Sequence, residues 1–130
     1  MIVLDASVVL EVLLGTPAGR SLESRIFRPE ETWHAPHLLD LEVLQVLRRY
    51  RRSGELSEER AQDAIGDLAD FPLHRYPHDL FLPRIWQLKD NLTAYDACYL
   101  ALAETLDAPL LTRDRRLAAA PGHGARVELV

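Results

Sequence analysis

The sequence predicts an α/β fold, a three-layer α/β/α sandwich with a mostly parallel central sheet. Short apolar runs alternate with helical stretches along the chain, which is the order expected when helices connect parallel strands. The length of 130 residues fits one domain of ordinary size, and no internal repeat or linker interrupts it. We therefore expect a single domain over residues 1–130.

The chain should begin with a strand followed by two helices. Met1–Leu4 is apolar and predicts a buried strand, with Asp5 at its end. A helix is expected from there to about Leu14, where Gly15-Thr16-Pro17 breaks it. Because its fixed φ suits the first helical position, Pro17 can open a second helix that runs to about Phe27.

The middle of the chain predicts one weak strand and two helices. The strand is expected at Thr32–Ala35, and Leu38–Arg52 is a clear amphipathic helix stopped by Ser53-Gly54. Ser57 precedes a polar first turn and should cap the next helix, which ends near Phe71-Pro72.

The last third of the chain continues the alternation. The expected elements are a strand over Leu73–Tyr76, helices over His78–Asp90 and Thr93–Leu106, and strands over Pro109–Thr112 and Arg126–Val130. In open parallel sheets, ligands bind outside the carboxyl ends of the strands. Asp5 and Asp114 each follow such an end, so both acids are expected at the binding edge.

Composition narrows the class of protein. The chain is 48% hydrophobic, enough for a core, and its lone Cys98 excludes an internal disulfide and a cysteine-rich zinc site. Its apolar runs are too short to span a bilayer, and no secretory signal is recognisable, so we expect a cytoplasmic protein without membrane contact.

The charge distribution argues against a passive nucleic-acid coat protein. The formal net charge is −5, from 15 basic and 20 acidic residues. Two arginine blocks lie within residues 48–52 and 113–116, and the simplest interpretation of each is a solvated helix face. An acidic protein can still bind phosphates where metals and local arginines supply positive charge.

Four acids are candidates for one site, although each also has a structural explanation. Asp5 could cap the helix that follows it, Asp114 could cap the turn Arg115–Ala119, and Thr93–Asp96 matches a capping box. Helical spacing, however, places Asp96 within the apolar arc of its helix and Glu42 on the shoulder of a core stripe. A carboxylate is costly to bury unless a cation or hydrogen bonds compensate it.

Carboxylates that meet at one sheet edge repel each other unless protons or cations neutralise them. Hard oxygen ligands with no nearby cysteine favour Mg²⁺ or Mn²⁺. Such an ion can bind a phosphate oxygen, acidify a water and stabilise a leaving oxygen, which is the chemistry of phosphodiester hydrolysis.

Four short motifs then resemble those of one family in order and spacing. They are Val3-Leu4-Asp5-Ala6-Ser7, Leu39-Asp40-Leu41-Glu42-Val43, Leu92-Thr93-Ala94-Tyr95-Asp96-Ala97 and Leu111-Thr112-Arg113-Asp114. Together they resemble the PIN-domain family, and more narrowly the VapC-type toxins of type II toxin–antitoxin pairs. The resemblance covers nearly the whole chain, although Leu56–Leu92 carries little recognisable signal.

This resemblance implies a metal-dependent endoribonuclease toxin in which a metal-activated water attacks an RNA phosphodiester. The residues implied to surround one or two Mg²⁺ or Mn²⁺ ions are Asp5, Glu42, Asp96 and Asp114. Hydroxyls at Ser7, Thr93 and Thr112 match positions that support the acids.

The resemblance also implies an RNA substrate and a cognate antitoxin, and we further expect a homodimer that the antitoxin holds inactive. The apolar stretch from Val8 to Leu14 leaves little of the first helix polar, so part of it is expected to contact another chain. The alternative is that this helix is wholly buried within one domain.

Two other functions stay open at this stage. One is a metal-dependent phosphatase or phosphoacceptor, although Ser7 stands where an aspartyl phosphatase wants a second Asp and Thr112-Arg113 where a receiver wants Lys. The other is a catalytically silent PIN-like binding or regulatory module.

Histidines and tryptophans are not assigned to the site. We expect His34, His37, His74 and His78 in loops or on the surface, and Trp33 and Trp86 in packing roles.

Overall fold

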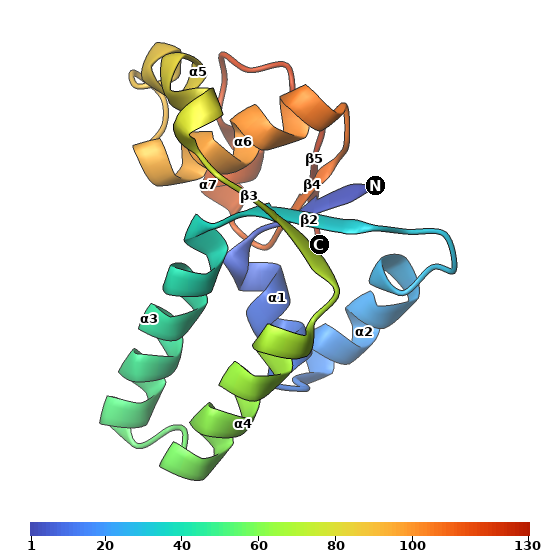
Figure 1. The fold of residues 1–130 in the computed structure, drawn as a ribbon, viewed down its shortest axis with the longest axis vertical. Helices are drawn as coiled ribbons and strands as arrows, with labels where there is room; N and C mark the ends of the chain where they lie inside the picture. The colour runs from blue at the N-terminus through green and yellow to red at the C-terminus, as the bar shows by residue number, and fades with distance from the viewer.

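A computed structural model describes all 130 residues and contains one five-stranded, all-parallel sheet in the order β3-β2-β1-β4-β5 (Figure 1). The strands are β1 (Ile2–Leu4), β2 (Trp33–Pro36), β3 (Leu73–Tyr76), β4 (Leu110–Thr112) and β5 (Val127–Leu129). Each was predicted from the sequence within one or two residues at either end. β1 lies at the centre, and burial of all three of its residues explains its uninterrupted apolar sequence.

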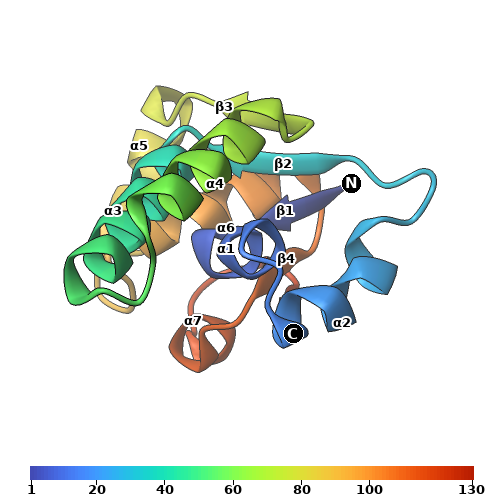
Figure 2. The ribbon, with the colours of Figure 1, turned by 90° about the horizontal axis from the view of Figure 1, so that it is seen from below.

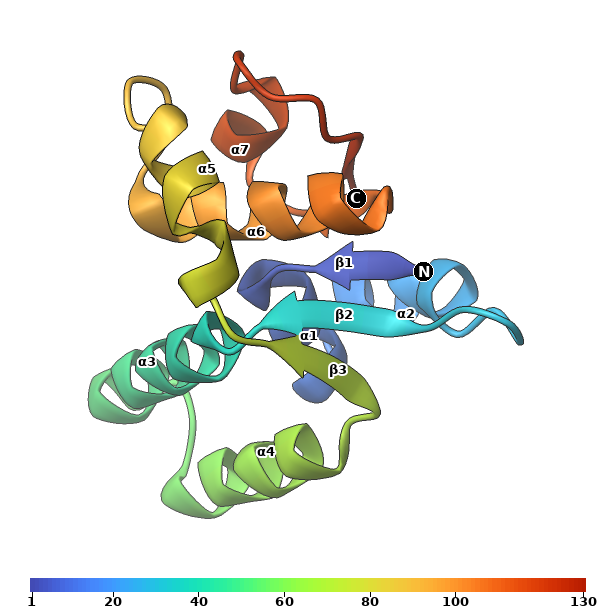
Figure 3. The ribbon, with the colours of Figure 1, turned by 45° about the horizontal axis from the view of Figure 1, so that its top comes forward.

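Helices cover both faces of the sheet, which confirms the predicted three-layer architecture. They are α1 (Ala6–Leu13), α2 (Pro17–Ile26), α3 (Leu38–Ser53), α4 (Glu58–Asp70), α5 (Leu82–Gln87), α6 (Ala94–Leu106) and α7 (Arg115–Ala119), with a 3₁₀ turn η1 (Asp79–Phe81). Helices α1 to α4 lie on one face and α5 to α7 on the other (Figures 2 and 3). None of the helices has the length and apolar character that a membrane crossing requires.

Strand register brings the candidate acids to one edge. Val3 of β1 lies beside His34 of β2 and Leu110 of β4, and Leu4 lies beside Leu111. Because all strands run the same way, Asp5 after β1 and the residues after Thr112 emerge at the same edge of the sheet.

Helix α1 is buried within the chain itself. Val8, Val9, Leu10 and Leu13 are buried, and α1 packs against α2, α3 and α4. The structure therefore favours the alternative, that most of this helix is buried within one domain. The reason is that the other three helices on this face of the sheet, α2, α3 and α4, pack around α1.

The prediction of one continuous helix over His78–Asp90 is wrong. The structure divides this segment into η1 and the short helix α5. Pro83 lies in the first turn of α5, where its missing N–H is harmless. In a continuous helix its ring would clash with the carbonyl of Asp79, so the chain restarts there.

One histidine and one tryptophan also differ from expectation. His34 lies in β2 and is only 6% exposed, because it stacks on His74 and forms a 2.6 Å hydrogen bond with the Tyr76 hydroxyl. Trp33 packs as predicted, between the rings of Phe27 and Phe71.

Trp86, in contrast, is 69% exposed and contributes little to the core. The prediction that it is a packing residue is wrong because α5 is too short and too peripheral to bury it.

Helix α2 approaches α1 so closely that only glycine fits at position 19. A Cβ at Gly19 would overlap the backbone carbonyl of Glu11, whereas a Cβ at Gly66 of α4 would meet open space. We expect Gly19→Ala to lower the free energy of unfolding by about 1–3 kcal/mol through overpacking. Gly66→Ala should raise it by about 0.5–1 kcal/mol, because alanine favours the helix.

Urea unfolding followed by circular dichroism measures both changes. Equal effects of the two substitutions would contradict the close α1–α2 contact.

Candidate active site

Four carboxylates from separate parts of the chain are brought to the carboxyl edge of the sheet. Asp5 follows β1, Glu42 lies in the first half of α3, Asp96 lies in the first turn of α6 and Asp114 follows β4. They differ in exposure: Asp5 is buried, Glu42 and Asp96 are half-buried, and Asp114 is exposed.

Asp5 is the most firmly held of the four. One oxygen accepts hydrogen bonds from the Ser7 hydroxyl and, at 3.2 Å, from the backbone N–H of Val8, while the other accepts one from the Thr112 hydroxyl. Burial raises the pKa of Asp5, and these three donors oppose that rise. The carboxylate therefore caps α1 and faces the site at the same time.

The two hydroxyls beside Asp5 also organise the loop after β4. The Ser7 oxygen accepts a 3.0 Å hydrogen bond from the backbone N–H of Arg113, and the Thr112 oxygen accepts one of 3.0 Å from that of Asp114. Asp114 in turn accepts a 2.8 Å hydrogen bond from the backbone N–H of Arg116 and so caps α7. Ser7 and Thr112 thus fix the positions of Asp5 and Asp114.

Glu42 is held by a residue that the sequence analysis did not assign to the site. The Tyr99 hydroxyl donates a 2.6 Å hydrogen bond to Glu42 Oε1. Burial raises the pKa of Glu42 and this hydrogen bond opposes the rise, whereas Asp96 and Asp5 raise the pKa further. Tyr99 lies three residues after Asp96 on α6, and this same-face spacing was the available signal.

Asp96 lies in the first turn of α6, which Thr93 caps. The Thr93 hydroxyl oxygen accepts a 3.1 Å hydrogen bond from the backbone N–H of Asp96. Burial raises the pKa of Asp96, and the charges of Asp114 and Asp5 raise it further.

These electrostatic effects link all four acids into one cluster. Asp5 and Asp96 act on Glu42, while Asp5 and Asp114 act on Asp96. The donor set is all oxygen, which matches Mg²⁺ or Mn²⁺ in chemistry. The spacing of the side chains does not yet match a metal site, because no group of three or more His, Cys, Asp or Glu side chains is gathered closely enough to hold one ion. Side-chain rotation would be needed to close the ligand set.

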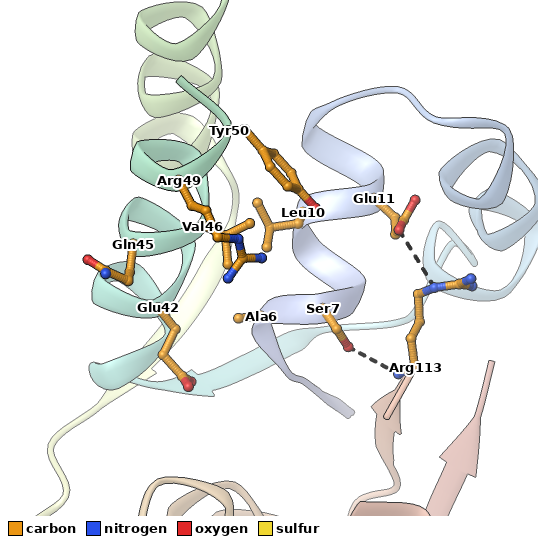
Figure 4. A pocket seen from close by; sticks show the side chains of 10 residues that line it. All are labelled: Ala6, Ser7, Leu10, Glu11, Glu42, Gln45, Val46, Arg49, Tyr50 and Arg113. Atoms are coloured by element: carbon orange, nitrogen blue, oxygen red, sulfur yellow. Dashed lines mark hydrogen bonds and ion pairs between the residues drawn. The ribbon is translucent and has the colours of Figure 1, made fainter. Parts of the chain in front are cut away.

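A cavity of about 430 Å³ adjoins the acids between α1 and α3 (Figure 4). Glu42 and Ser7 line its end nearest the sheet, and Arg49, Tyr50 and Leu10 lie deeper between the helices. The acid cluster therefore opens into a space large enough for part of a bound molecule.

Comparison with known proteins decides the family. The family model described as "PIN domain" matches residues 2–122. The chain is also 47% identical to Ribonuclease VapC1 of Mycobacterium tuberculosis, over 98% of this chain and 96% of that protein. This chain belongs to the PIN-domain family. Within it, the chain groups with the VapC ribonucleases, as its four motifs predicted.

Solved structures support the fold of this PIN domain. PAE2754 from Pyrobaculum aerophilum superposes with a TM-score of 0.71 at 24% identity, over 99% of this chain and 83% of that one. VapBC2 from Rickettsia felis, bound to a DNA fragment from its promoter, gives a TM-score of 0.70 at 14% identity, over 98% of both chains.

Burial of Asp96, together with repulsion by Asp114 and Asp5, should make stability depend on pH. Because the pKa of Asp96 is raised above its ordinary value of 3.8 in the folded protein, the folded state holds this proton more tightly than the unfolded chain does. The contribution of Asp96 protonation to the free energy of unfolding is therefore lost as pH rises from 3.8 through the pKa of Asp96 in the folded protein. Asp96→Asn should be more stable than wild type at neutral pH with chelator.

This advantage should shrink as pH falls below the ordinary pKa of an aspartate, since wild-type Asp96 is then neutral in both states. Urea unfolding of the two proteins at neutral and acidic pH measures the difference. An advantage that stays constant across this range would argue against a raised pKa of Asp96 in the folded protein.

Proposed function

We propose that this chain is a metal-dependent endoribonuclease and the toxin of a toxin–antitoxin pair, working as one nuclease domain over residues 1–130. The observation that carries the proposal is the placement of four carboxylates at the carboxyl edge of the sheet, where Asp5 and Asp96 act on Glu42 and Asp5 and Asp114 act on Asp96. The relatives named as ribonucleases favour this function over a phosphatase. The intact acid set favours it over a silent binding module.

Asp5, Glu42, Asp96 and Asp114 are the residues that would hold Mg²⁺ or Mn²⁺. When bound, such an ion supplies positive charge to a phosphate oxygen and lowers the pKa of a nearby water. Asp5 is the fixed member of the set, since Ser7 and Thr112 orient both of its oxygens.

The other carboxylates are held less firmly. Tyr99 directs one oxygen of Glu42 and leaves the other available. Thr93 fixes the first turn of α6, on which Asp96 is carried.

Partners follow from the same proposal. RNA is the substrate, and a cognate antitoxin holds the enzyme inactive. A neighbour in fold that was solved as a toxin–antitoxin complex from Klebsiella pneumoniae supports the existence of such a partner. An Arg or Lys of the antitoxin would neutralise the acids in place of the metal, through charge-assisted hydrogen bonds.

Loss of one carboxylate charge should abolish cleavage without unfolding the domain. We expect Asp5→Asn and Asp96→Asn to have no detectable activity on mixed RNA with Mn²⁺, because an amide cannot replace the charge that retains the ion. Asp67→Asn is the matched control, since Asp67 is exposed on α4 away from the site, and it should cleave like wild type.

Thermal melting gives a readout independent of the RNA. Saturating Mn²⁺ should raise the melting temperature of wild type by several degrees, since binding at a hundredfold excess over Kd contributes about 2.7 kcal/mol. Asp96→Asn should respond less. Near wild-type cleavage by either site variant would refute the assignment, as would a wild-type melting temperature insensitive to millimolar Mn²⁺.

The predicted homodimer can form through a surface other than α1. Four large apolar side chains are strongly exposed around η1, α5 and the start of α6: Leu80 at 75%, Leu82 at 55%, Trp86 at 69% and Tyr95 at 62%. Leu82 and Tyr95 also line a small apolar cavity there. Such a patch is typical of a surface covered by another chain.

We expect Trp86→Glu to convert a dimer into a monomer, because it replaces an exposed apolar ring of this patch by a charge. Size exclusion with light scattering at micromolar concentration measures the mass. Ile65→Glu is the control, since Ile65 is also exposed, at 42%, but lies on α4. A monomeric wild type would disprove the dimer, and a dimeric Trp86→Glu would exclude this patch.

A further inference from the structure

The cavity between α1 and α3 continues directly from the acid cluster. Glu42 belongs to both, and Ser7, which donates to Asp5, lines the opposite wall. A strand whose scissile phosphate lies at the acid cluster would therefore enter this cavity on one side.

Helix α3 directs one arginine into this space. Glu42, Gln45, Val46 and Arg49 follow the spacing of one helical face, and all four line the cavity. Figure 4 shows the Arg49 guanidinium pointing between the two helices. The Tyr50 ring supports it, with its centroid 5.5 Å from the guanidinium carbon.

Of the two arginines that line the cavity, Arg49 is the one without a competing partner. Arg113 lines the cavity too, but its guanidinium lies 3.7 Å from Glu11 and donates to the Val130 carbonyl. Arg51 forms an ion pair with Glu58 in the separate groove between α3 and α4. Arg49 takes part in no ion pair, so its charge is available to a ligand anion.

We propose that Arg49 binds an RNA backbone phosphate next to the scissile one at the acid cluster, so that the strand leaves the site between α1 and α3. This assignment rests on the proposed ribonuclease function. Arginine suits phosphate because its planar fork donates two parallel hydrogen bonds. The apolar wall formed by Leu10 and Val46 suits a ribose or base rather than a further phosphate.

Binding can be measured apart from cleavage in an Asp96→Asn background. With a fluorescein-labelled, random-sequence single-stranded RNA, we expect Arg49→Ala to weaken binding about tenfold, the loss of one charge-assisted contact. The slope of log affinity against log salt should fall by about 0.7, as for one lost phosphate contact. Arg49→Lys should restore most of that slope.

Arg48→Ala is the matched control, because Arg48 is the neighbouring arginine but lines the α3–α4 groove. It should leave affinity and salt slope unchanged. With Asp96 intact, Arg49→Ala should raise KM while largely retaining kcat, which a distortion of the acid cluster would not do.

Two results would overturn the assignment. One is an Arg49→Ala protein that matches Arg48→Ala in affinity and salt slope. The other is unchanged RNA affinity with loss of inhibition by the cognate antitoxin, which would assign the cavity to an acidic side chain of that partner. The ribonuclease proposal is judged separately, by whether wild type cleaves RNA with Mn²⁺ and Asp96→Asn does not.

Discussion

The rest of the structure depends on one buried carboxylate at the end of the central strand. Asp5 follows β1, where water is largely excluded, and a charge there must be compensated within the protein. Ser7 and Val8 from α1 and Thr112 from β4 supply the hydrogen bonds. These contacts hold together the central strand, the first helix and the neighbouring strand, which are also the elements that carry the site.

The other acids are arranged around this fixed point at different depths. Tyr99 connects Glu42 on α3 to α6, across the edge of the sheet between the two helical layers. Asp96 and Asp114 lie at helix starts, where backbone N–H groups offset part of their mutual repulsion. The fold tolerates the acid cluster because well-packed strands and helices hold the four side chains in place. Their charge remains available to a cation.

Most of the fold could be predicted because short strands alternate with helices along the chain. The two strands at its centre, β1 and β4, are apolar or nearly so, and several helices begin at a capping residue. The break before α5 was missed because Pro83 is compatible with either a helix start or its interruption. His34 was misplaced because pairing between β2 and β3 decides its burial, and such pairing leaves no local pattern. The site acids were recognisable as a set by their motifs. Tyr99 and Arg49 were not, since contacts between distant segments define their roles.

The capping role of the acids has an evolutionary consequence. Asparagine caps a helix about as well as aspartate does, but it carries no charge. A lineage in which the activity becomes harmful can therefore replace Asp5 or Asp114 with asparagine and keep the helix start intact. Such a gene would go on producing a stable protein that still occupies its partners. Inactive copies of this fold should thus persist as decoys rather than disappear through misfolding and degradation.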